Sequence, residues 1–166
     1  MQIRLFFILT ALFGSCVSGC TRVRYMQEIY RVSYTEQSGT ISPEMQLSER
    51  IVITSDQVTL TRKGKTADTT VNEGVWKIQV DEQETKKLFE HLQTVDCSSI
   101  KRVEPDELEI GGGTRSYDIV YAGDKTFSLD YGRGVTYTDG ALLVEPIDTF
   151  IKNLVFPAGA TMQYKH

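Results

Sequence analysis

The sequence predicts an α+β fold, a mostly antiparallel sheet of about five or six strands with two helices packed on one face. Two hydrophobic periodicities predict it: alternation over several short segments marks strands, and spacings of three and four mark two helices. The order of strands, a helix, more strands and a closing helix is typical of α+β domains. With 166 residues, 40% of them hydrophobic and 16 aromatic, the chain can bury one core.

The first strand is expected within residues 21–34. Met26, Tyr30, Val32 and Tyr34 share one parity there, while polar residues take the other. This alternation suits a half-buried strand better than a helix. Residues 37–47 contain a glycine and a proline and are expected to form a loop.

A hairpin is predicted over residues 50–63. Its apolar residues fall on one face if Ile53 pairs with Val58 and Ile51 with Leu60, around a two-residue turn at 55–56.

Residues 75–81 alternate apolar and polar side chains and predict a further strand, with Trp76 toward the core. A helix should follow, from about Asp81 to about Thr94. Asp81 is a suitable N-cap, and Glu84 stands three positions later. Its apolar stripe is Leu88, Phe89, Leu92 and Val95. The charged residues 101–109 are expected to be a connection.

The second hairpin, residues 114–131, gives the strongest strand signal. Its apolar residues are Tyr117, Ile119, Tyr121, Phe127, Leu129 and Tyr131. All six have odd residue numbers, so the residue numbers of two cross-strand partners on this face add up to an even number. The turn between the strands must therefore contain an odd number of residues or a bulge. Gly123 and Asp124 stand where that turn would fall.

Residues 132–140 are rich in glycine and predict a flexible link. A last helix is expected to open at Glu145-Pro146, where the missing N–H of proline is harmless in a first turn. Pro157 should end it, and residues 157–166 are expected to form a frayed C-terminal tail.

The N-terminus carries a secretory signal. A single positive charge at Arg4 precedes an apolar run over residues 5–13, which is too short to span a bilayer permanently, and small residues follow it. The segment Val17-Ser18-Gly19-Cys20 resembles the lipobox of bacterial lipoproteins. That resemblance implies cleavage between Gly19 and Cys20, and thioether lipidation of Cys20 with diacylglycerol and palmitate-like chains. The alternatives are an ordinary cleaved signal or cleavage before Cys16.

Lipidation would anchor the mature protein to a membrane without spanning it, because two or three acyl chains hold firmly where one does not. Thr21 follows the anchor in place of the aspartate that retains many lipoproteins in the inner membrane. The resemblance therefore implies an outer-membrane protein facing the periplasm. The expected organisation is a signal peptide (1–19), a lipidated tether (20–24), one α+β domain (25–156) and the tail (157–166).

Removing residues 1–19 takes away Arg4 and no acid, so the net charge falls from −4 to −5, which disfavours nucleic acid as a partner. Of the three cysteines, Cys16 leaves with the signal and Cys20 would carry lipid. Cys97 would then have no intramolecular partner for a disulfide.

Candidate chemistry is sparse, and we predict no catalytic, metal or cofactor-binding residue and identify no small-molecule ligand. Residues 111–113 are three glycines but should lead into a strand, not a phosphate-binding helix N-terminus. The acids Glu104, Asp106, Glu107 and Glu109 lack the spacing of a calcium loop. Cys97 has no neighbouring base in the sequence, and His91 lies at the margin of a helix stripe.

The domain's element order also resembles small uncharacterised lipoprotein domains of Gram-negative envelopes. The leading hypothesis is a non-enzymatic binding or accessory module of the cell envelope, with an envelope protein as its partner. One alternative is a periplasmic protease inhibitor presenting residues 132–140. Another is a hydrolytic enzyme using Asp118, Asp130 or His91.

Overall fold

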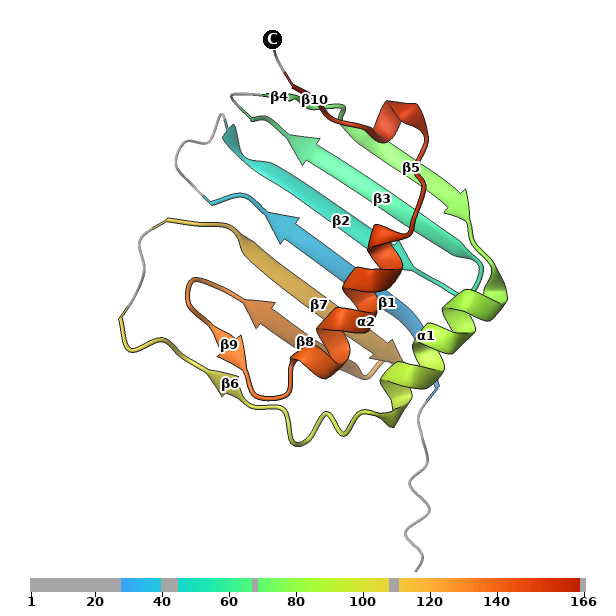
Figure 1. Cartoon of the computed structure of the whole chain (residues 1–166), viewed down its shortest axis with the longest axis vertical. Helices are drawn as coiled ribbons and strands as arrows, with labels where there is room; N and C mark the ends of the chain where they lie inside the picture. The colour runs from blue at the N-terminus through green and yellow to red at the C-terminus, as the bar shows by residue number, and fades with distance from the viewer. Residues whose placement is uncertain (1–27, 40–44, 67–68, 108–110, 165–166) are drawn as a thin grey trace, which may run out of the picture.

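A computed structural model describes residues 28–39, 45–66, 69–107 and 111–164. Its main body is a six-stranded antiparallel sheet with two α-helices on one side (Figure 1). The elements in chain order are β1 (Ile29–Gln37), β2 (Leu47–Ile53), β3 (Gln57–Gly64), β4 (Thr69–Thr70), β5 (Gly74–Gln79), α1 (Glu82–Thr94), β6 (Arg102–Val103), β7 (Thr114–Tyr121), β8 (Thr126–Tyr131), β9 (Thr136–Tyr137), α2 (Ala141–Lys152), a 3₁₀ turn η2 (Ala158–Ala160) and β10 (Gln163–Tyr164).

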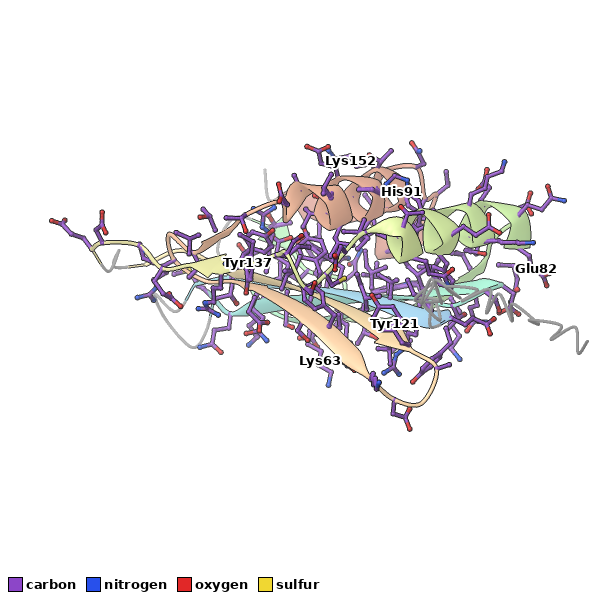
Figure 2. All side chains as sticks on the ribbon, turned by 90° about the horizontal axis from the view of Figure 1, so that it is seen from below. Lys63, Glu82, His91, Tyr121, Tyr137 and Lys152 are labelled. Carbon is purple, nitrogen blue, oxygen red and sulfur yellow. The ribbon has the colours of Figure 1, made fainter. Side chains whose placement is uncertain are left out.

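The strand order in the main sheet is β5-β3-β2-β1-β7-β8. Both helices pack on the same face, which Figure 2 shows edge-on. We call this the covered face, and the other the open face. The predicted α+β class, with an antiparallel sheet and two helices, is thus confirmed. No helix in the described part of the chain is long and apolar enough to cross a membrane.

Both predicted hairpins have the expected registers. In the first, Ile53 pairs with Val58 and Ile51 with Leu60. In the second, every facing pair sums to an even number, as in Tyr117 with Leu129. Its turn is closed by the bond from the Tyr121 amide to the Lys125 carbonyl (2.8 Å) and contains three residues. Gly123 and Asp124 take positive φ angles of 81° and 60° there, as such a turn requires.

The parity expected for the first strand is wrong at Tyr30. Ile29 is buried and Tyr30 is exposed, although Val32 is buried as expected. The pairing of β1 with β7 shifts register between Ile29 and Arg31. This bulge inserts one residue, so the alternation reverses across it. Met26, expected in the same strand, lies outside the described residues.

Helix α1 has nearly the predicted bounds. The Asp81 carboxylate caps it, because its Oδ1 accepts a hydrogen bond from the Gln83 amide (2.8 Å). Leu88, Phe89 and Leu92 are buried against the sheet as predicted. Thr85 is buried as well, and its hydroxyl donates to the Ser55 carbonyl in the β2–β3 turn. That hydrogen bond ties the helix start to one end of the sheet.

Helix α2 begins at Ala141, four residues before the predicted start. Pro146 is its sixth residue, not a first-turn residue. Buried Leu143 lies one turn before buried Ile147 and extends the apolar stripe backward. The carbonyl that Pro146 leaves without an N–H partner belongs to Leu142, which lies on the solvent-facing side of the helix with 53% of the residue exposed.

The C-terminal segment is not frayed over residues 157–164. It crosses the covered face beyond α2, forms η2 and pairs as β10 with β4 (Figure 1). Ala160 is buried, and its carbonyl accepts a hydrogen bond from Arg62 Nη1 (2.5 Å). The prediction failed because the partners of this segment lie about 90–100 residues away in the sequence.

Residues 132–140 are not a flexible link either. Strand β9 pairs with β6, which lies inside the predicted charged connection. Val135 is buried, and the Asp130 amide donates to the Tyr137 hydroxyl (2.9 Å). The segment that the inhibitor alternative required as a loop is therefore held by a short β-ribbon beside β8.

Candidate binding surfaces

The predicted lipidation site, Cys20, and the cleavage position after Gly19 lie outside the described residues. The structure shows instead where the chain enters the domain. Glu28 precedes β1, and its carbonyl accepts from the Ala122 amide in the β7–β8 turn (2.7 Å). Strands β1, β3 and β8 begin at this end of the sheet, and β2, β5 and β7 finish there. We call it the near end, and the opposite end the far end.

The near end is acidic. Its turns, the first residue before β1 and the exposed side of α1 beside them carry six carboxylates and two ammonium groups: Glu28, Asp56, Asp81, Glu82, Glu90 and Asp124, with Lys86 and Lys125. Lys86 lies 3.8 Å from Glu90, as a solvent-exposed ion pair that contributes little. An open pocket of about 540 Å³ lies here between α1 and the start of β1, with Ile29 and Phe89 among its lining residues.

A ladder of four tyrosines, Tyr34, Tyr117, Tyr131 and Tyr137, crosses the covered face from β1 to β9. Successive ring centroids are 5.2, 5.9 and 5.0 Å apart, in tilted and edge-on geometries that aromatic pairs favour. The register places Tyr34 directly opposite Tyr117. A Cβ on Gly140 would lie 2.6 Å from the Tyr131 hydroxyl, so α2 can start against the ladder only with glycine at this position.

Two of the ladder's hydroxyls donate to carboxylates. Tyr117 donates to Asp148 of α2 (2.9 Å), and Tyr34 donates to Glu36 (2.7 Å). Partial burial, followed by these hydrogen bonds, raises the pKa of Tyr117 and of Tyr34 well above the ordinary value. Partial burial also raises the pKa of Tyr131. The ladder is therefore a protonated, hydrogen-bonded extension of the core across the neutral range.

At the far end, the covered face ends in a charged row. Adjacent strands there place Arg62, Glu49, Glu36, Arg115 and Tyr131 side by side. Arg62 is only 6% exposed. It forms an ion pair with Glu49, lies 5.5 Å from the Trp76 ring and donates to the Ala160 carbonyl. It is satisfied by several partners, as a buried guanidinium requires, and it holds the C-terminal segment in place.

The open face has a different composition. Beyond the bulge at Tyr30, the strands carry no aromatic residue on this face, which consists mainly of serine, threonine and glutamine with a few charges. One row across the sheet runs Lys77, Thr59, Val52, Ser33, Asp118 and Ser128. The next runs Val75, Thr61, Arg50, Thr35, Ser116 and Asp130. The cations lie on β5, β3, β2 and β1, and the acids lie on β7 and β8.

The residues named for a possible enzyme do not converge. Asp118 and Asp130 lie on the open face, where Asp118 accepts from the Ser128 hydroxyl (2.7 Å). His91 lies on α1, beyond the covered face, and lines a shallow groove between the helices (Figure 2). The sheet therefore separates the histidine from both aspartates.

Cys97 is a partly buried free thiol that follows α1. Its Sγ lies 3.4 Å from the Tyr121 hydroxyl. Burial, with this hydrogen bond, raises the pKa of Tyr121 above the ordinary value. A protonated phenol is no base for activating a thiol at neutral pH, so the pair is a packing contact of the core margin.

The segments considered for phosphate and calcium binding form ordinary backbone connections. Gly111 and Gly112 take positive φ angles near 95° and lead into β7, a strand, as predicted. Glu104, Asp106 and Glu107 belong to a partly exposed connection, and Glu109 lies outside the described residues. Among the described residues, no group of three histidine, cysteine or acidic side chains could hold a metal ion.

Sequence reasoning missed Arg62. Its signal was present, because residues 58, 60 and 62 share a parity in β3 and therefore face the same side of the sheet. A charge on a core-facing position of a predicted strand points to a buried ion pair.

Comparisons with protein-family models, with curated proteins and with solved structures give no match to this chain.

Proposed function

We propose that this protein is a lipid-anchored module of the bacterial cell envelope that binds a partner and performs no catalysis of its own. The observation that carries the proposal is the segment Val17-Ser18-Gly19-Cys20 behind a short apolar run. With Cys20 acylated and Thr21 in second position, the module is placed on the periplasmic side of the outer membrane.

The spacing between anchor and domain supports this role. Eight residues lie between Cys20 and Ile29, where β1 begins. A fully extended chain spans about 3.3–3.6 Å per residue, so the near end is held within about 30 Å of the lipid. Such a tether suits a domain that works beside the membrane.

The charge distribution indicates which surfaces of the domain can face away from the membrane and bind a partner. Among the described residues, the near end carries an excess of acids and no lysine or arginine cluster of the kind that anionic lipid surfaces recruit. The open face and the far end are then the surfaces presented to the periplasm. Their hydroxyl groups and mixed charges suit a polar protein partner.

Substitution of the anchor tests the proposal. Cys20→Ala should stop the incorporation of labelled palmitate and leave an uncleaved or soluble product. Cys97→Ala is the matched control, because it removes the other mature cysteine and should leave labelling unchanged. Membrane partitioning of a cleaved Cys20→Ala protein would contradict the proposed anchor.

The proposed membrane can be tested through the next residue. Thr21→Asp should shift the acylated protein from the outer to the inner membrane in density-separated envelopes. A conservative Thr21→Ser should leave it in place. Inner-membrane recovery of the unsubstituted protein would contradict the outer-membrane assignment and leave the acylation assignment standing.

A further inference from the structure

We propose that two copies of this chain pair through their open faces. The first observation is that this face has no covering layer among the described elements, while both helices and the C-terminal segment lie on the other side (Figure 2). A sheet face of six strands that carries no helix is available to a second sheet, and sheets pack face to face about 10 Å apart.

The second observation is the distribution of charge. Lys77 and Lys63 lie on the β5–β3 side of the open face, and Arg50 lies on β2. The acids of this face, Asp118 and Asp130, lie on β7 and β8 at the opposite edge. On a single copy, the β5-β3-β2 half of this face is therefore cationic, and both acids lie in the β1-β7-β8 half, which also contains Arg31 of β1.

Consider a two-fold axis that lies between the two facing sheets, parallel to their strands and level with the boundary between β1 and β2. This axis places the cationic half of each copy over the half of the other copy that carries the acids. It places β5 of one copy over β8 of the other, and β3 over β7, because the strand order is β5-β3-β2-β1-β7-β8. Lys77 then lies over the β8 strand of the second copy, two residues from the level of Asp130, a span that a lysine side chain reaches. The axis makes each such contact twice, as closed symmetry requires.

This arrangement also suits two anchored chains, and here it rests on the proposed function. An axis along the strands keeps both near ends on the same side, so both tethers reach one membrane leaflet. Antiparallel pairing of two β5 edges would instead place the near ends at opposite ends of the strands. The lipid anchors therefore favour the face-to-face dimer.

The area available predicts a weak dimer. The open face is about five strand spacings wide, at about 4.8 Å each, and about six residues long, at about 3.4 Å each. Its area is therefore roughly 500 Å² per copy. Stable interfaces bury about 800 Å² per partner, so the dimer is at the weak end of the range. Tethering in one leaflet raises the effective concentration and compensates for this.

Zero-length carbodiimide crosslinking of the acylated protein in vesicles tests the geometry, because it joins an ammonium group to a carboxylate in contact. Lys77 and Asp130 lie at opposite edges of one sheet, about 24 Å apart, so a link between them must join two copies. We expect a crosslinked dimer that contains this link, or the neighbouring link from Lys77 to Asp118. A dimer linked only through residues of the helix layer would overturn the proposal.

Charge exchange tests the pairing by a second route. Lys77→Glu and Asp130→Lys should each weaken dimerisation at low salt at least about tenfold, measured by sedimentation of the acylated protein in density-matched detergent. A mixture of the two variants should dimerise again, because each like-charge contact becomes an opposite-charge one. Lys87→Glu makes the same charge change on exposed α1 and should have no effect.

The outcomes separate this inference from the anchor. Intact mass reports acylation on the same samples, so an unmodified chain contradicts the anchor and not the dimer. An acylated chain that stays monomeric would contradict the face-to-face dimer, and so would charge variants that do not restore dimerisation when mixed. Neither result would contradict the proposed anchor.

Discussion

The two faces of the sheet are built from alternate residues of the same strands, yet they have opposite compositions. On the covered face, two rows of aliphatic and aromatic side chains form the core, and only the far-end row is charged. On the open face, serine, threonine and glutamine dominate, and the few charges are sorted by edge. The packing that stabilises the fold is therefore concentrated on the covered face, and most substitutions on the open face should cost little stability.

The largest effect that should separate the faces comes from neighbouring residues of β3. Leu60 faces the core and is 4% exposed, whereas Thr61 lies on the open face. Leu60→Ala should lower the free energy of unfolding by about 3 kcal/mol, because it leaves a cavity. Thr61→Ala should change it by less than about 0.5 kcal/mol. Urea unfolding measures both, and equal losses would contradict the assignment of the faces.

The next effect concerns the charged end of the covered face. Arg62→Ala should destabilise the protein by about 2–3 kcal/mol, since it leaves Glu49 and the Ala160 carbonyl without their buried donor. Faster hydrogen exchange should follow at the Ala160 and Thr161 amides, and the emission of Trp76, the only tryptophan, should change.

Arg50→Ala is the matched control for Arg62, because this arginine is exposed on the open face of the adjacent strand. It should leave stability, exchange and emission nearly unchanged. An Arg62→Ala protein with unaltered exchange at Ala160 would show that the C-terminal segment is held by other contacts.

A smaller effect depends on pH. The pKa values of Tyr34, Tyr117 and Tyr131 are raised in the folded protein, so their contribution to stability is complete below the unfolded tyrosine pKa of about 10. As the pH rises above that value the contribution is lost, because unfolding then releases protons. Unfolding midpoints should fall at alkaline pH, and Tyr34→Phe with Tyr117→Phe should reduce the slope.

Absorbance titration of the native protein gives an independent check on the ladder. The ladder tyrosines with raised pKa values should ionise only at high pH, after the alkaline loss of structure begins. Ionisation of all eight tyrosines together at their ordinary pKa would contradict the hydrogen bonds to Asp148 and Glu36.

The smallest effect belongs to the helix layer. Asp81→Ala removes the side chain that caps α1 and should cost about 1 kcal/mol. Asp81→Asn should retain most of the stability, since an amide oxygen also accepts from the Gln83 amide. Equal destabilisation by both variants would show that charge, not capping, stabilises the helix start.

Local patterns predicted the parts of the fold that depend on local chemistry. Alternation and turn length fixed the registers of both hairpins, and the cap and stripe of α1 fixed that helix. The bulge at Tyr30 was not predicted, because strand predictions rest on regular alternation of apolar and polar residues and an inserted residue breaks that alternation. The start of helix α2 was predicted too late because proline favours a first turn, whereas Pro146 lies inside this helix on a turn that faces solvent.

Long-range partners explain the remaining failures. The C-terminal segment and β9 each contain few residues and obtain their order from Arg62, β4 and β6, which lie far away in the sequence. Arg62 itself carried a readable signal in its parity. The sorting of charge on the open face could be seen only once the strand order was known, because chain order does not give it.

The proposed anchor at Cys20 is tested most directly by the intact mass and N-terminal fragments of the protein purified from the membranes of its own cells. We expect a chain that begins at Cys20 and carries added acyl mass on that residue. An N-terminus elsewhere, or an unmodified Cys20, would contradict the anchor and the envelope role proposed from it.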